Sequence, residues 1–159
     1  MTFYAIKRTP ADKWFSYLIR FRDNWTCVFC STQDYARAHN MPEALKPGPS
    51  NIECAHIFSR AGLYSAGRHD TENAVSLCHK CHDKFSHNSE GWERWCKLRL
   101  GQRYYLLKLK SKRVNPLGKY FTKELTETLK QAVIRIAIRT ERLWIIEKDL
   151  SKKDLKTVR

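Results

Sequence analysis

Two pairs of cysteines constrain this chain more than any other feature of its sequence. Each pair has two residues between its cysteines, with Cys27 and Cys30 in one and Cys78 and Cys81 in the other. This spacing lets both thiolates of a pair reach one tetrahedral ion at a metal–sulfur distance of roughly 2.3 Å. Four thiolates leave no open coordination position, so we predict a structural zinc ion. A redox-active pair or a set of buried free thiols is the alternative.

The rest of the composition favours metal over disulfide bonds. We find no apolar run of roughly 18 residues and no apolar signal-peptide core near the N-terminus, so we expect a cytoplasmic protein without a membrane partner. Six cysteines in that compartment indicate metal binding rather than a disulfide framework. Cys54 and Cys96, which lie outside the pairs, are expected to be small buried hydrophobic residues.

The charge of the chain indicates a polyanionic partner. Its 30 Lys and Arg residues outnumber 16 Asp and Glu residues, which gives a net charge of +14. Such an excess favours nucleic acid or an anionic membrane surface, and we expect DNA, because neutralised phosphates supply most non-specific affinity. A solvated basic face over an aromatic core is the alternative. The basic residues that follow the second cysteine pair are Arg94, Lys97, Arg99, Arg103, Lys108, Lys110, Lys112 and Arg113.

Hydrophobic periodicity predicts an α+β fold. Residues 10–22 carry apolar side chains at helical intervals. Residues 52–58 and 74–77 are short, apolar segments of the kind that pair as the two strands of a hairpin. A helix is expected to begin near Cys81, and another is expected over residues 91–100.

The C-terminal part is expected to be mainly helical. Apolar residues recur about every three to four positions over residues 122–150, which predicts one long helix, and the charged residues 151–159 are expected to fray. Residues 104–112 alternate aliphatic and basic side chains, and periodicity leaves their state open. We assign residues 1–100 to a zinc-stapled domain and residues 101–159 to a basic extension. The apolar stripe of the long helix makes a homodimer through it plausible.

A second set of chemically capable residues lies between and beside the cysteine pairs. The chain reads Glu53-Cys54-Ala55-His56-Ile57, then Asn73, then Cys81-His82. The segments "CAHIFSR" and "HDTENAVSLCHKCH" resemble the strand–loop–strand–helix unit of the HNH (ββα-metal) endonucleases. The resemblance covers about residues 25–87. It implies a small ββα-metal core with a zinc knuckle, flanked by the N-terminal helix and the helical extension.

The resemblance also implies a reaction and a role for each residue. HNH enzymes hydrolyse DNA phosphodiester bonds and leave 5′-phosphate and 3′-hydroxyl ends. His56 takes the position of the general base, a role that suits an imidazole with a pKa near 6.5. His82 takes the position of a ligand to a catalytic divalent cation. Asn73 takes the position of the residue that holds the intervening loop through backbone hydrogen bonds.

The chain departs from the family pattern at one position. Many family members place a second metal ligand directly before the general base, where this chain has Ala55. Glu53 lies on the same strand face as Ala55 and is our replacement ligand, directly or through water. The cation is then Mg²⁺ or Mn²⁺, with Ni²⁺ or Zn²⁺ open for a histidine-rich site. His87 is expected to be a surface residue.

Arginine side chains near the motif offer contacts to substrate. Arg60 follows His56 by four residues, and its guanidinium could hold a phosphate through two parallel hydrogen bonds. Arg68 and His69 are weaker candidates for the same role.

Two broader questions stay open at this level. The chain looks like small phage-encoded HNH proteins and is faintly similar to the lambda-type phage recombination nucleases (NinG/Rap), which act on branched DNA. The competing hypothesis is a zinc-knuckle module that binds DNA without cutting it, and Ala55 is the residue that favours this second hypothesis.

Overall fold

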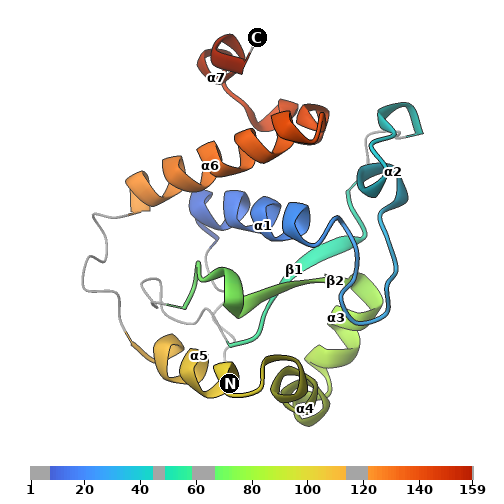
Figure 1. The fold of residues 1–159 in the computed structure, drawn as a ribbon, viewed down its shortest axis with the longest axis vertical. Coiled ribbons are helices and arrows are strands. Elements are labelled where there is room, and N and C mark those ends of the chain that lie inside the picture. Colours follow the sequence, from blue (N-terminus) through green and yellow to red (C-terminus); the bar gives the residue numbers. More distant parts are fainter. Residues whose placement is uncertain (1–7, 45–48, 59–66, 114–121, 159) are drawn as a thin grey trace.

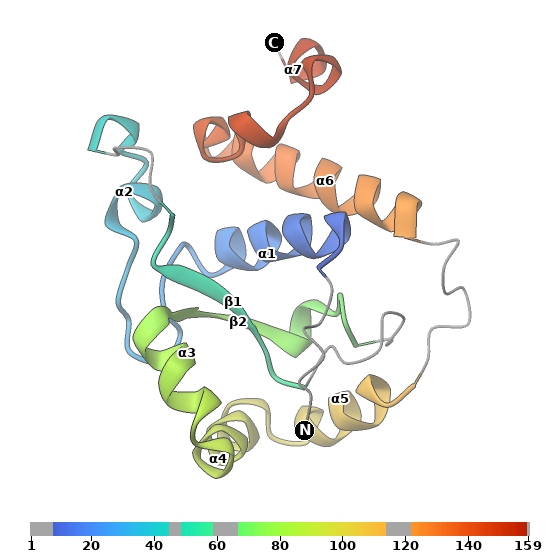
Figure 2. The same ribbon diagram turned by 180° about the vertical axis from the view of Figure 1, so that it is seen from behind.

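The fold places one β-hairpin between two groups of helices. The structure is a computed structural model, and it describes residues 8–44, 49–58, 67–113 and 122–158. Figures 1 and 2 show helix α1 against one side of the hairpin and helix α3 against the other, with α6 lying along the outer side of α1. The α+β class is therefore confirmed.

Helix α1 spans Pro10–Arg22, as predicted, and its first turn is closed by local hydrogen bonds. The backbone N–H of Thr9 donates to the carboxylate of Asp12 (2.7 Å), and the N–H of Asp12 donates to the Thr9 hydroxyl (3.3 Å). This capping box and Pro10 in the first turn explain why the helix begins there. After α1 the chain turns sharply, because Asn24 and Trp25 both adopt left-handed backbone angles, with φ of 48° and 54°.

The hairpin consists of strand β1 (Ile52–His56) and strand β2 (Ala74–Cys78), paired antiparallel with Ile52 opposite Cys78 and His56 opposite Ala74. The first strand thus ends two residues earlier than predicted. The short turn η2 (Thr71–Asn73) leads into β2. Side chains alternate along β1, so Cys54 and His56 lie on the face toward α1, whereas Glu53 and Ala55 lie on the face toward α3.

Three helices follow β2 directly, and the undecided segment is one of them. Contacts join α3 to both strands, α3 to α4 and α4 to α5, so these helices form a second group below the hairpin in Figure 1. Their bounds are α3 His79–Ser86, α4 Ser89–Leu100 and α5 Arg103–Ser111. The short helix α2 (Tyr35–Ala38) and the turn η1 (Pro42–Ala44) lie between α1 and the hairpin in sequence.

The predicted long C-terminal helix is wrong in its length. Helix α6 spans Thr122–Arg139 and ends there, because Glu141 adopts a left-handed φ of 57° and the chain reverses. Short turns follow over Leu143–Ile145 (η4) and Glu147–Asp149 (η5). The tail expected to fray instead forms helix α7 (Lys152–Val158), which Lys130 of α6 contacts through Asp154 (2.7 Å).

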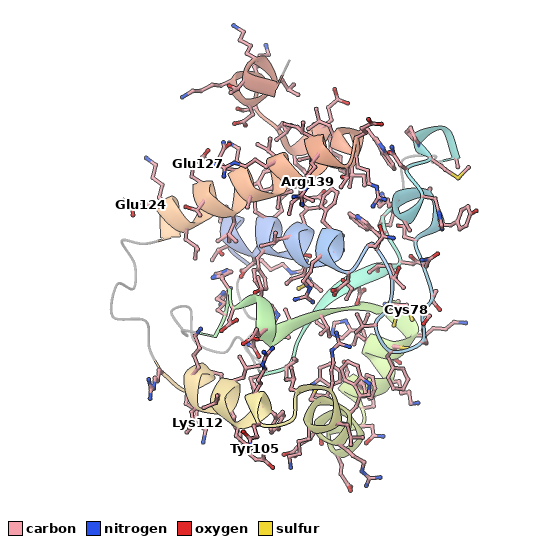
Figure 3. The ribbon with its side chains drawn as sticks, viewed as in Figure 1. Cys78, Tyr105, Lys112, Glu124, Glu127 and Arg139 are labelled. Carbon is pink, nitrogen blue, oxygen red and sulfur yellow. The ribbon has the colours of Figure 1, made fainter. Side chains whose placement is uncertain are left out.

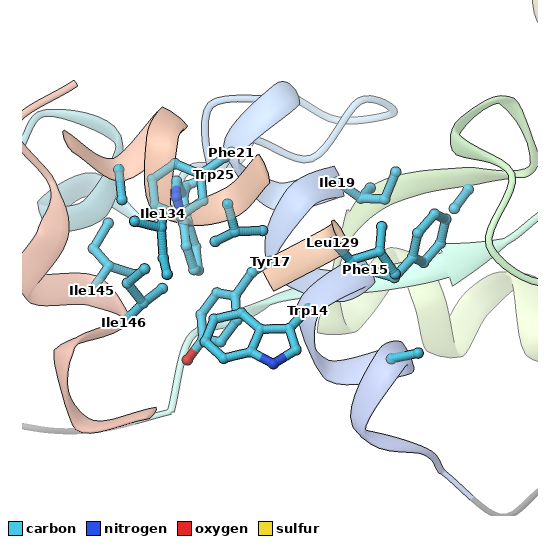
Figure 4. Packing of buried hydrophobic residues seen from close by; sticks show 14 of the residues in the cluster. Trp14, Phe15, Tyr17, Ile19, Phe21, Trp25, Leu129, Ile134, Ile145 and Ile146 are labelled. Carbon is cyan, nitrogen blue, oxygen red and sulfur yellow. The ribbon is translucent and has the colours of Figure 1, made fainter. Parts of the chain in front are cut away.

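The larger apolar core lies between α1 and the C-terminal elements. Figure 4 shows aromatic and aliphatic side chains of α1 packed against α6 and the segment after it. Trp25, Val133 and Ile146 are completely buried there. The apolar stripe of α6 therefore packs on α1 within the same chain, while a homodimer through this helix stays a prediction. Among the described helices, none has both the length and the apolar character needed to cross a membrane.

Candidate active site and metal centre

The four paired cysteines come together as predicted. Cys27 and Cys30 lie in a turn closed by the pairing of Thr26 with Gln33, and Cys78 and Cys81 lie where β2 passes into α3. Their four sulfur atoms all lie within 4.8 Å of one another. Figure 3 shows Cys78 at the junction where the loop after α1 meets α3.

The sulfur geometry suits zinc. A tetrahedral ion with metal–sulfur bonds of roughly 2.3 Å sets its ligands about 3.8 Å apart, and Cys30 Sγ lies 3.6 Å from Cys78 Sγ. The backbone N–H of Val28 donates to the Ser76 carbonyl (2.9 Å), which fixes one pair against the other. The four cysteines could hold a structural metal ion such as zinc.

The protonation of the thiols is consistent with a bound dication. Hydrogen bonds from Thr32 lower the pKa of Cys30 to about 6. Burial raises the pKa of Cys78 and of Cys81, and neighbouring sulfur atoms raise that of Cys81 further. Cys78 and Cys81 thus ionise less readily than free thiols, and a bound cation would offset this, because a metal ion deprotonates the thiols that coordinate it.

His56 lies at the end of β1 with its ring fixed from two sides. The ring packs against Phe15 of α1, with ring centroids 5.6 Å apart. Its Nε2 lies 2.8 Å from the backbone carbonyl oxygen of Arg68. A carbonyl oxygen only accepts, so Nε2 carries the proton in the neutral ring and Nδ1 holds the basic lone pair.

Asn73 is buried, with 1% of its surface exposed, and it joins the two ends of the segment between the strands. Its Oδ1 accepts from the N–H of Phe58 (2.8 Å), and its Nδ2 donates to the carbonyls of Gly67 (2.9 Å) and Phe58 (3.2 Å). Only an amide can accept and donate in this way at one position. Asn73 therefore holds Phe58 and Gly67 at a set separation, close to both His56 and Arg68.

Glu53 contacts two histidines on the other side of the hairpin. One carboxylate oxygen accepts a short hydrogen bond from Nδ1 of His82, and the other lies 3.2 Å from Nδ1 of His79. Burial raises the pKa of Glu53, but the hydrogen bonds from His82 and His79 outweigh it, so the pKa is lowered and the carboxylate stays ionised. Ala55 is buried, with 3% exposed, and offers no ligand.

Comparison with known proteins adds no assignment. The chain matches no family model, no curated protein and no solved structure. The chemistry of the site is therefore inferred from the residues themselves.

The remaining candidate residues of the motif region have different outcomes. His87 is exposed at the end of α3, where its Nδ1 contacts the carbonyl of Asp83 (3.0 Å), as expected of a surface residue. Arg60, our predicted phosphate contact, lies outside the described residues. Arg68 is not a surface clamp, since only 1% of it is exposed.

The partner of Arg68 is not evident from the sequence. The Arg68 guanidinium donates to both carboxylate oxygens of Asp12, with distances of 2.9 Å from Nε and 2.6 Å from Nη2. His69 Nε2 also lies 2.9 Å from that carboxylate. Burial raises the pKa of Asp12, but the hydrogen bonds from His69 and Arg68 lower it well below its usual range. Thr9 and Asp12 are recognisable in the sequence as a helix cap, but that signal says nothing of Arg68.

A cleft of about 760 Å³ opens beside these residues. It runs between α1, β1 and the C-terminal turns, and His56, Glu53 and His82 all line it. A second, smaller hollow of about 170 Å³ lies on the other side, and His56 and His82 line it as well. Both histidines are thus accessible from solvent-filled space.

Proposed function

We propose that this protein is a metal-dependent endonuclease of the HNH type that hydrolyses DNA. The observation that carries the proposal is the juxtaposition of His56, Asn73 and His82 on one strand–loop–strand–helix unit beside the four-cysteine cluster. A pure binding protein has no need of an imidazole held by a backbone carbonyl at the edge of a cleft.

In this proposal His56 is the general base. Its Nδ1 removes a proton from the attacking water, and the Arg68 carbonyl stabilises the resulting imidazolium through Nε2–H. Water attacks phosphorus, the bond to the 3′ oxygen breaks, and this oxygen takes up a proton from solvent, so the products carry a 5′-phosphate and a 3′-hydroxyl. Asn73 acts through position alone, because it holds the backbone on both sides of His56.

The chain also offers residues for the divalent cation. Nδ1 of His82 donates to Glu53, so Nε2 of His82 would be the atom that holds the metal, and Glu53 would either orient this ligand or join it. A bound Mg²⁺ or Mn²⁺ would polarise the phosphate and offset charge on the leaving oxygen. Ni²⁺ or Zn²⁺ is an alternative cation, because His79 also contacts Glu53 and a second histidine favours these ions.

The test is nicking of supercoiled plasmid by zinc-loaded protein, with Mg²⁺, Mn²⁺ or Ni²⁺ added in turn and with none. We expect cleavage that needs an added cation and that falls by about 10²–10⁴-fold in His56→Ala. His87→Ala is the matched control, because this histidine is exposed and lies outside the site. Glu53→Gln should raise the cation concentration needed by about 10–100-fold.

The second candidate function is a zinc-stapled DNA-binding module. The buried Ala55, where a metal ligand is expected, favours it. The plasmid assay separates the two functions, because a binding module does not cut DNA whichever cation is added, although it binds DNA in a salt-dependent way. If the wild-type protein cleaves DNA with none of the cations, the nuclease proposal is wrong and the DNA-binding module takes its place.

A further inference from the structure

The cleft continues along α1 beyond His56 and reaches Arg20. The Phe15 ring packs on His56, and Arg20 is five residues further along the same helix, about 7.5 Å at 1.5 Å per residue. On the opposite wall, Cys54 lies two residues from His56, about 7 Å along the strand, and interacts electrostatically with Arg20. Arg20 and His56 therefore line one and the same cleft.

Arg20 has the surroundings of an anion-binding residue. Its guanidinium carbon lies 4.7 Å from the ring centroid of Tyr17 and 4.8 Å from that of Trp25. Its Nε donates to the Ser16 carbonyl (3.1 Å), yet no carboxylate of the described residues forms an ion pair with it. Burial lowers the pKa of Arg20, which expresses the free-energy cost of a desolvated cation. Such a cost is ordinarily offset by a bound counter-charge.

The other charges along the cleft favour an anion too. Its carboxylates, Asp12 and Glu53, are already bound by neighbouring arginine and histidine side chains. Arg8 and Lys148 are exposed at its rim, and neither forms an ion pair within the described part of the chain. Two other basic residues that line the cleft are already paired, Lys13 with Asp149 and Arg37 with Asp34, so the charge available to an anion comes from Arg8, Arg20 and Lys148.

We propose that this cleft binds an unpaired DNA strand that runs from the scissile phosphate at His56 to Arg20. Because His56 and Arg20 line the same cleft, one strand can contact both residues. The volume of about 760 Å³ lies in the range of sites that enclose a drug-sized ligand, and we take a single strand rather than a duplex as the occupant. Arg20, stacked on Tyr17 and Trp25, binds a backbone phosphate.

The placement of the scissile phosphate rests on the proposed nuclease function, but the strand-binding test does not need cleavage. Zinc-loaded protein without added divalent cation is titrated against a fluorescein-labelled DNA strand and against the same strand in duplex form, and anisotropy is measured over a range of salt concentrations. We expect wild type to bind the strand more tightly than the duplex. Arg20→Gln should weaken strand binding by about tenfold and reduce the salt slope by about 0.7.

Two further variants keep the test decisive. Arg135→Gln is the matched control, since Arg135 is exposed on α6 and does not line the cleft. The double variant Arg8→Gln/Lys148→Gln removes two exposed charges from the rim. It is tested in place of Arg20→Gln if the Arg20 variant does not fold. Strand affinity equal to wild type in the folded cleft variants overturns the proposal, and so does tighter binding of the duplex. If the protein binds the strand but cleaves DNA with none of the cations, the nuclease proposal is wrong and the strand-binding proposal still holds.

Discussion

Arg68 and Asp12 form a buried, two-point ion pair that joins the segment before β2 to the first turn of α1. Both side chains are almost fully enclosed, with 1% of Arg68 and 4% of Asp12 exposed. The backbone carbonyl of the same arginine accepts the hydrogen bond from His56. The N-terminal helix therefore reaches the proposed general base in two ways, through Arg68 and through the packing of Phe15 on His56.

Removing this pair should be costly. Asp12→Asn leaves the Arg68 guanidinium buried without its counter-charge, so we expect the free energy of unfolding in urea to fall by about 3 kcal/mol. Glu90→Gln is the control, because the exposed Glu90–Arg94 pair should contribute under about 1 kcal/mol. Equal effects of the two substitutions would mean that the Asp12 contact adds no more than a surface pair.

The same contact predicts a pH dependence. Hydrogen bonds from His69 and Arg68 outweigh burial and hold the pKa of Asp12 below its ordinary value of 3.8. A depressed pKa in the folded state stabilises the protein above the unfolded-state value and loses that contribution as the pH falls further. We therefore expect the difference in unfolding free energy between wild type and Asp12→Asn to shrink below about pH 4. Zinc loss in acid affects both proteins alike, so a difference that stays constant to low pH would contradict this prediction.

Asn73 offers a test of loop positioning. Asn73→Asp keeps an oxygen for the Phe58 N–H but loses the N–H donor to the carbonyls of Gly67 and Phe58. We expect a loss of about 1–3 kcal/mol in unfolding free energy, together with slower plasmid nicking. Asn88→Asp is a matched control. The Asn88 side chain accepts from the backbone N–H of Gly91 at the start of α4, and aspartate caps a helix equally well. Comparable losses in both variants would argue against the role of the Asn73 donor.

The cysteine cluster predicts a metal content. Purified protein should contain about one zinc ion per chain, and Cys81→Ser should lose it and melt at a lower temperature. Cys96→Ala is the control, since Cys96 is completely buried but lies outside the cluster. Zinc content is measured by release to a colorimetric chelator. Zinc retained by Cys81→Ser and lost by Cys96→Ala would refute the assignment of the ligands.

The sequence alone predicted what depends on short spacings. The two cysteine pairs, the helix over 10–22 and the order strand, strand, helix around Cys78 follow from local periodicity and ligand spacing, and the structure has them. The face alternation of β1 also separated Glu53 from His56 correctly. The predicted end of the long helix was wrong. The apolar pattern continues past Arg139, but the backbone reverses at Glu141.

Tertiary structure alone decided the surroundings of the proposed base. Asp12 and Arg68 are 56 residues apart in sequence, and no local pattern says that α1 docks where their side chains meet. The same docking sets Arg20 beside the cleft and turns Arg68, which reads as a surface cation, into a buried one. Spacing determines which residues can share a metal ion or a helix face. The packing of α1 across the hairpin determines which charges lose their water and must find a partner.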